Sequence, residues 1–222
     1  MTDRTLDLLG QLGHRIEQRR YRQIYCNRDI RLAEVDWIGF DMDYTLAIYR
    51  REELDALAHR LTVDRLVTSM GYPEALRDVP PNTDFAIRGL VVDKRNGHML
   101  KLNRHRQVGR GICGFRELTS EELAPYRREP PNLSSRRFTL VDTLFELPEA
   151  YLFAALVQIH EDQELRVDFG RLAEDVRAAV DSIHGDGSLK AEVTSHLDRY
   201  VFADPELAQA LHRFRSAGKR LF

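Results

Sequence analysis

Residues 38–46 read IGFDMDYTL and place two aspartates directly behind an apolar run. The run, residues 35–40, is short and has no polar face, which is typical of a buried parallel strand. Ligands bind at the carboxyl ends of the strands in an open parallel sheet, and Asp41 and Asp43 would lie at that edge. A simple surface turn is disfavoured because unpaired charge is costly beside a buried strand. We therefore predict a catalytic or metal-binding role for the pair.

A calcium loop does not fit this stretch. An EF-hand requires Asp or Asn at its fifth position and Gly at its sixth, where this chain has Thr45 and Leu46. The chemistry that needs such a pair is phosphoryl transfer. Asp41 would be the nucleophile and a Mg²⁺ ligand, because the cation offsets the repulsion between carboxylate and phosphate. Asp43, also expected at the metal, would protonate the leaving alkoxide and later deprotonate the attacking water.

Composition excludes several other classes of protein. The 222 residues are 43% hydrophobic and 31% charged, which permits one large or two small globular domains. The formal net charge of -2 gives no global field for a nucleic acid or an anionic membrane. No apolar run approaches the ~18 residues of a membrane span, and no signal peptide is apparent, so a cytoplasmic location is expected. The two cysteines, Cys26 and Cys113, are expected to be free thiols.

Local signals predict an α/β pattern that is interrupted after its first strand. Asn96-Gly97 between two apolar runs predicts a type I′ hairpin. KRLF, at the end of the chain, has the residue pattern that begins a second core strand. We therefore expect an N-terminal fragment or truncated product of a longer α/β protein. The predicted helices are an amphipathic helix at 4–22, one from 51 closed by Gly71, a short one capped by Thr119 and Glu122, one opened by Pro148, one over 171–184, and one from Asp204-Pro205 to Gly218.

The stretch WIGFDMDYTLAIYR resembles motif I of the haloacid dehalogenase (HAD) superfamily, in the variant typical of the cytosolic purine 5′-nucleotidases of type II, which prefer IMP and GMP, and of their bacterial relatives. RGLVVDKRNGHMLKLN, FTLVDTLFELPEAYL and DVRAAVDSIHGDGSLK resemble further segments of that family in the expected order. The resemblance implies an α/β fold with a HAD-like Rossmannoid core, incomplete here, and a large α+β cap inserted after the first core strand. The implied parts are an N-terminal helical segment at 1–30, partial core at 31–50 and 196–222, and the cap at 51–195.

Three polar residues of the helix over 171–184 are candidate substrate contacts. Arg177, Asp181 and His184 fall on one arc beside the apolar face. Periodicity alone also allows a solvated face with an i,i+4 Arg–Asp pair. The resemblance aligns the three with substrate-contacting positions of the family, and Lys190 with a lysine near the phosphate.

Two neighbouring residues are candidates for holding the base. The resemblance implies that Phe145 stacks on the purine, although the residue alone fits a core position equally well. Glu146 stands where well-studied relatives carry an asparagine, and a carboxylate cannot donate to a purine O6. Gly185 replaces an aromatic residue of those relatives.

The predicted function is a Mg²⁺-dependent 5′-nucleotidase that hydrolyses purine nucleoside monophosphates. Two alternatives remain open: a HAD phosphatase acting on another phosphomonoester, favoured by Glu146 and Gly185, and a non-catalytic nucleotide-binding or interaction module, favoured by the truncation. The resemblance places the family's phosphate-binding hydroxyl, a lysine and further acidic ligands beyond Phe222, so the chain alone is expected to be inactive. No nucleic-acid or membrane partner is expected, and a homo-oligomer is left open.

Overall fold

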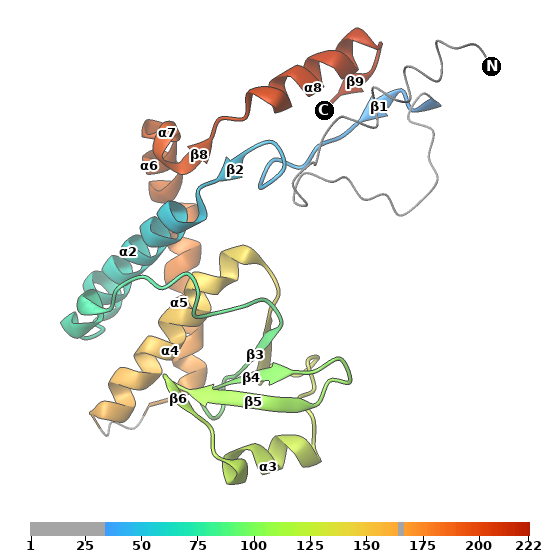
Figure 1. Cartoon of the computed structure of the whole chain (residues 1–222). Helices are drawn as coiled ribbons and strands as arrows, with labels where there is room; N and C mark the ends of the chain where they lie inside the picture. Colours follow the sequence, from blue (N-terminus) through green and yellow to red (C-terminus); the bar gives the residue numbers. More distant parts are fainter. Residues whose placement is uncertain (1–33, 164–166) are drawn as a thin grey trace. The chain divides into compact units, whose positions relative to one another are not determined.

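A computed structural model describes residues 34–163 and 167–222 (Figure 1). The predicted helix at 4–22 and Cys26 lie outside the described residues. The chain divides into two compact units, Met1–Phe40 with Ala208–Phe222, and Asp41–Leu207. Each unit is described here by itself.

The first unit contains a parallel pair of short strands. β1 (Trp37–Ile38) pairs with β9 (Arg220–Leu221), with Trp37 opposite Arg220. The prediction that KRLF begins a strand is therefore confirmed. The prediction that the first strand is buried is wrong for the described residues, because Trp37 is 54% exposed. A sheet of two strands is too small to bury its own side chains, and within the described residues this sheet has two strands.

The last helix, α8 (Pro205–Ser216), has the predicted ends. The Asp204 carboxylate accepts a hydrogen bond from the Glu206 N–H at 3.0 Å, as expected of an N-cap. Gly218 follows the helix with φ of 83°, a left-handed conformation that a glycine adopts without steric cost.

The second unit is built on an antiparallel sheet, with its neighbouring strands in the order β6-β5-β4-β3-β7. The predicted hairpin joins its third and fourth members, but its turn is not type I′. Gly97 has φ of 71° while Asn96 stays out of the left-handed region, and the Gly97 N–H donates to the Asp93 carbonyl at 3.0 Å. The strands are β3 (Leu90–Asp93), β4 (His98–Leu102), β5 (Val108–Cys113), β6 (Arg116–Glu117) and β7 (Phe138–Val141).

Most of the helices of this unit end where local signals predict. Thr119 and Glu122 form the predicted capping box, and Gly71 closes the first helix in a left-handed conformation. Pro148 lies in the first turn of the apolar helix, where its missing N–H has no consequence. The elements are α2 (Arg51–Met70), η3 (Glu74–Asp78), α3 (Ser120–Arg128), η4 (Leu144–Glu146), α4 (Leu147–Asp162), α5 (Phe169–Gly185), α6 (Ser188–Ser195) and α7 (Leu197–Tyr200).

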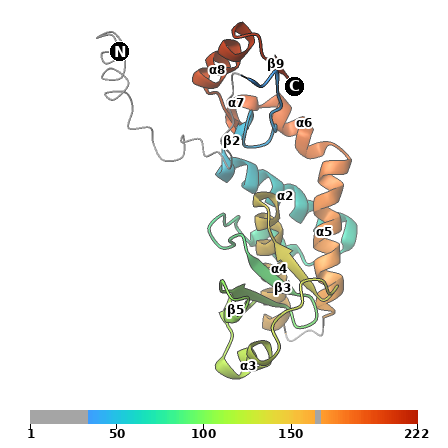
Figure 2. The ribbon, with the colours of Figure 1, turned by 90° about the vertical axis from the view of Figure 1, so that its right-hand side faces the viewer.

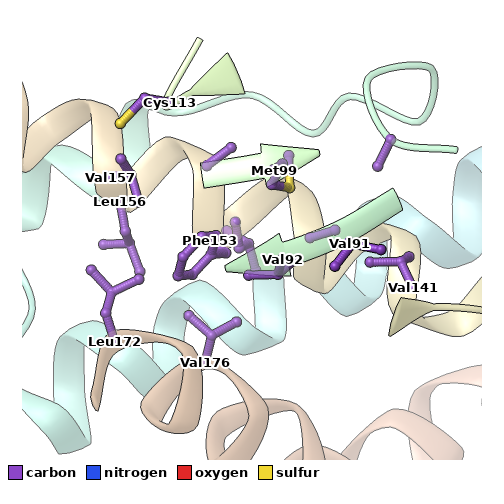
Figure 3. Packing of buried hydrophobic residues seen from close by; sticks show 14 of the residues in the cluster. Val91, Val92, Met99, Cys113, Val141, Phe153, Leu156, Val157, Leu172 and Val176 are labelled. Atoms are coloured by element: carbon purple, nitrogen blue, oxygen red, sulfur yellow. The ribbon is translucent and has the colours of Figure 1, made fainter. Parts of the chain in front are cut away.

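The sheet is covered on both faces, as Figure 2 shows from the side. Side chains alternate along a strand, so Val92 and Asp93 of β3 point to opposite faces. Val92 lies with Phe153 of α4 and Val176 of α5 in the main core (Figure 3). Asp93, on the other face, accepts a hydrogen bond from the Tyr126 hydroxyl of α3 at 2.6 Å. The result is a layered α/β unit with α4 and α5 on one face and α3 on the other.

The segment that contains the helices and the five-stranded sheet begins and ends at one pair of strands. β2 (Ile48–Tyr49) pairs antiparallel with β8 (Val201–Phe202), and the Arg50 N–H donates to the Tyr200 carbonyl at 2.7 Å. A small second core of Leu54, Leu57, Leu189 and Tyr200 lies beside this junction. The cap and its bounds, 51–195, stay a prediction.

None of the helices in residues 34–163 and 167–222 combines the length and the apolar character that a bilayer crossing needs.

Candidate active site

Asp41 and Asp43 lie on a tight turn that begins three residues after β1, and both are exposed to solvent. The Met42 carbonyl oxygen closes this turn by accepting the backbone N–H groups of Thr45, Leu46 and Ala47, at 3.3, 2.9 and 2.8 Å. The Thr45 side chain makes no hydrogen bond within the described part of the chain. Both carboxylates are therefore open to a phosphate and a metal ion approaching from solvent.

A tyrosine from β2 holds the second acid. The Tyr49 hydroxyl donates to Asp43 Oδ1 at 2.8 Å. Burial raises the pKa of Tyr49 to about 12, with the hydrogen bond to Asp43 adding to the shift, so the hydroxyl keeps its proton at neutral pH. The antiparallel pairing of β2 with β8 thus fixes the position of the Asp43 side chain.

The turn contacts the aromatic residue that was predicted to stack on the base. Tyr44, at φ of 56°, projects its ring toward Phe145 of η4, with 5.6 Å between the ring centroids. Phe145 is 43% exposed, so it is not a core residue. Residues 101 positions apart in the sequence are brought together, because Phe145 follows β7 and Tyr44 follows β1.

Glu146 is occupied by its own backbone. One of its carboxylate oxygens accepts the N–H groups of Asp142 and Thr143, at 2.7 and 2.9 Å, and the other accepts from Arg177 Nη2 at 3.3 Å. Burial raises the pKa of Glu146, but these three hydrogen bonds outweigh it and lower the pKa below the ordinary value. Glu146 is therefore ionised at neutral pH, and both of its oxygens are engaged in holding the turn and Arg177.

Arg177 bridges two glutamates. Its Nη2 lies 3.3 Å from Glu146 and its Nε lies 3.1 Å from Glu149 of α4. No ion pair joins Arg177 to Asp181 in the described part of the chain, so the solvated i,i+4 pair that periodicity allowed is not what forms. Packing of α5 against α4 turns the guanidinium toward the glutamates instead.

A pocket of about 250 Å³ lies against this ion-pair group. Strands β3 and β7 and helices α4 and α5 supply its walls, and its charged lining residues are Lys94, Glu146, Glu149, Glu174, Arg177 and Asp181. The predicted contacts Arg177 and Asp181 therefore meet at one pocket with Glu146. His184 and Lys190 are exposed and are not among its lining residues.

Glu149 is a candidate that sequence reasoning missed. Its side chain is 16% exposed, and burial raises its pKa to about 7, with Arg177 lowering it and Glu146 and Asp181 raising it further. One signal could have identified it: Glu149 is the single charged residue in the otherwise apolar stretch 147–157. A lone acid in such a helix needs a buried partner.

The aspartate turn has the donor atoms that a magnesium site uses. Protein sites hold Mg²⁺ through one or two carboxylates, with water and substrate phosphate oxygens completing the octahedron. Asp41 and Asp43 supply two such carboxylates. Within residues 34–163 and 167–222, no group of three or more acidic, histidine or cysteine side chains has an arrangement that could hold a metal ion. Asp41 and Asp43 would therefore be the ligands that this part of the chain provides.

These features describe a mixed α/β protein with exposed paired carboxylates and a nearby pocket. The sequence model of the 5′ nucleotidase family matches residues 24–222, and the chain belongs to this family.

Curated relatives agree with the family assignment. A 5′-nucleotidase domain-containing protein of Dictyostelium discoideum is 34% identical over 206 residues, which are 90% of this chain and 35% of the relative. The 5′-nucleotidase domain-containing protein 2 of Homo sapiens is 29% identical over 217 residues, 90% of this chain and 40% of the relative, and its Rattus norvegicus counterpart is 28% identical. The chain thus spans well under half the length of these relatives.

Proposed function

We propose that this chain carries the catalytic aspartates of a Mg²⁺-dependent 5′-nucleotidase of the HAD type, which hydrolyses purine nucleoside monophosphates through a phosphorylated Asp41. Membership of the 5′ nucleotidase family supports hydrolysis of nucleotide phosphomonoesters in general. The observation that carries the finer proposal is the contact of the aspartate turn with Phe145 through Tyr44, at 5.6 Å between centroids. This contact supports the proposal because it joins the turn that carries Asp41 to an exposed aromatic ring on which a base could stack.

The proposed reaction has two steps. In the first, an Asp41 carboxylate oxygen attacks phosphorus, the bond from phosphorus to the ester oxygen breaks, and Asp43 gives its proton to that oxygen. In the second, water attacks the same phosphorus, Asp43 takes the water proton, and Asp41 is released as a carboxylate. Mg²⁺, when bound by Asp41 and Asp43, would neutralise the charge on the phosphate.

The pocket residues have separate proposed roles. Arg177 has five N–H groups, of which two are used by Glu146 and Glu149, so others remain for a base carbonyl. Asp181 accepts from the base or ribose. Glu146 acts through Arg177 and not on the base, since its oxygens are engaged. His184 and Lys190 keep their predicted roles, with Lys190 on the phosphate as a point charge.

Phosphate release from IMP, GMP, AMP and a non-nucleotide phosphomonoester, with and without Mg²⁺, tests the proposal on the protein at its natural full length. Asp41→Asn should lower kcat on the order of 10³-fold or more, since it removes the nucleophile. Asp43→Asn should lower it by about 10²- to 10⁴-fold, the usual contribution of a general acid. Asp64→Asn, which changes an exposed acid of α2, is the matched control and should have no effect.

Two outcomes would favour the alternatives. Faster turnover of the non-nucleotide ester would indicate a phosphatase for another substrate, an option that Glu146 and Gly185 keep open. Nucleotide binding that depends neither on Mg²⁺ nor on Asp41 would indicate a binding module, and the catalytic proposal would then be wrong.

A further inference from the structure

One carboxylate oxygen in the pocket wall has no hydrogen-bond partner. Glu149 Oε1 lies 3.1 Å from Arg177 Nε, whereas Oε2 is buried and has no partner among the described residues. A buried carboxylate oxygen without a partner is destabilising unless a proton or a donor group reaches it. Glu149 lines the pocket, so a bound ligand can supply that donor.

The charge of the pocket favours a donor of N–H type over a phosphate. Lining residues carry four carboxylates, Glu146, Glu149, Glu174 and Asp181, against two cations, Lys94 and Arg177. This excess of negative charge repels a phosphate dianion but attracts the N–H edge of a neutral ring. At about 250 Å³, the pocket is below the range of about 300–1,000 Å³ typical of whole drug-sized ligands, which suits a base alone.

We propose that Glu149 is a specificity-determining residue whose free oxygen accepts a hydrogen bond from a ring N–H of the bound nucleobase, so that binding of such a base releases a proton. This inference rests on the proposed function, in which the pocket residues Arg177 and Asp181 contact the base. Before binding, burial holds the pKa of Glu149 at about 7. A hydrogen bond to the ionised form favours that form and lowers the pKa, so protonated molecules lose their proton on binding.

Other charged groups around Glu149 also affect whether its carboxylate binds or releases a proton. Arg177 favours the ionised form, while Glu146 on η4 and Asp181 on α5 favour the protonated one. Glu174 and Lys94 line the same pocket. Because Arg177 remains bound to Oε1, the new hydrogen bond adds to an existing cationic partner, and the combined effect stabilises the carboxylate.

Calorimetric titration with two nucleosides, in buffers of different ionisation enthalpy, tests the inference. Inosine has one ring N–H, and purine riboside has the same ring system with none. With pKa near 7, roughly half the sites are protonated at pH 7, so inosine should release up to about half a proton per site. Its affinity should rise between pH 6 and pH 8 and then level off. Purine riboside should bind more weakly, with no proton released and no such rise.

Variants separate the effect of the Glu149 carboxylate on binding from the effect of the pocket's shape. Glu149→Gln cannot ionise, so inosine should bind about tenfold more weakly at pH 8, without proton release and without pH dependence. Purine riboside binding to the same variant should stay close to wild type, which shows that the pocket is intact. Glu121→Gln, an identical change on the exposed side of α3, should behave as wild type.

The outcomes distinguish this inference from the proposed function. Inosine binding without proton release, or with unchanged linkage in Glu149→Gln, would overturn the role of Glu149 and leave the nucleotidase proposal standing. Proton-linked inosine binding by a protein that releases no phosphate from nucleotides would overturn the proposed hydrolysis and retain the role of Glu149. Absence of nucleoside binding would overturn the role of Glu149, while phosphate release from nucleotides decides the proposed hydrolysis.

Discussion

Asp93 is a buried charge whose carboxylate is matched by specific partners. Its side chain is fully buried, and it accepts from Arg137 Nε at 2.8 Å, Arg137 Nη2 at 2.5 Å and the Tyr126 hydroxyl at 2.6 Å. These bonds join β3 to α3 and to the chain before β7. Removing one partner of such a group leaves the others buried without a counterpart.

Asp93→Asn should therefore lower the free energy of unfolding by about 3 kcal/mol, because the Arg137 guanidinium loses its charged partner. Chemical denaturation at pH 7 measures the change. Asp64→Asn, which removes a solvent-exposed partner of Arg77, should leave the midpoint unchanged. Equal effects of the two substitutions would contradict the view that burial decides the strength of these pairs.

The same residue predicts how stability depends on pH. Burial raises the pKa of Asp93, but hydrogen bonds from Arg137, Tyr126 and the Arg95 N–H outweigh it, so the pKa lies below its ordinary value of 3.8. A depressed pKa gives stability that is fully present above the unfolded value and is lost as the pH falls through the folded value. Asp93→Asn should abolish this part of the acid-induced loss below about pH 4, measured as the difference between wild-type and variant unfolding curves.

Among the elements, β3, β4 and their connection depend on one glycine. Gly97 has φ of 71°, and a Cβ built there would lie 2.7 Å from the ring of Phe169. Both the left-handed backbone and this close approach oppose any larger residue.

Gly97→Ala should lower the free energy of unfolding by about 1–3 kcal/mol, since the new methyl group adds backbone strain and overpacking. Gly109→Ala is the matched control, because its Cβ would meet nothing within 4 Å and its φ is not positive. That variant should be neutral or slightly more stable. Thermal unfolding of both variants measures the difference, and a loss of equal size in Gly109→Ala would contradict the explanation.

Elements with strong local signals were predictable from the sequence, and pairings between distant short strands were not. The Thr119–Glu122 capping box and the Gly71 helix end need only neighbouring residues. By contrast, β2 and β8 have two residues each and lie about 150 positions apart, so no pattern in either indicates the other. Their pairing depends on the packing of the whole insertion.

In the candidate site, too, some residues could be predicted from their neighbours in the sequence and others could not. Asp41 and Asp43 could be located because they follow an apolar strand-like run, whereas Glu149 was missed because its importance comes from Arg177, which lies on another helix. Predicted burial of the first strand failed because burial depends on what covers a sheet, and the described residues supply two strands.

At the scale of the molecule, the buried residues of both hydrophobic cores come from the part of the sequence between β2 and β8. A segment of residues 48–202 should therefore fold alone, with one cooperative thermal transition followed by circular dichroism. A segment of residues 51–195, the predicted cap, should be less stable, because it lacks Tyr200, which is 1% exposed in the smaller core. Equal stability of the two segments would show that the β2–β8 junction contributes nothing to folding.

The central claim is that Asp41 becomes phosphorylated, and trapping the acyl phosphate tests it most directly. The full-length protein is mixed with a nucleoside monophosphate and Mg²⁺, quenched, reduced with borohydride and digested for mass spectrometry. The account predicts that the peptide containing Asp41 carries the reduced residue at that position, and that Asp41→Asn gives no labelled peptide. Label on a different residue, or nucleotide hydrolysis at an undiminished rate by Asp41→Asn, would contradict it.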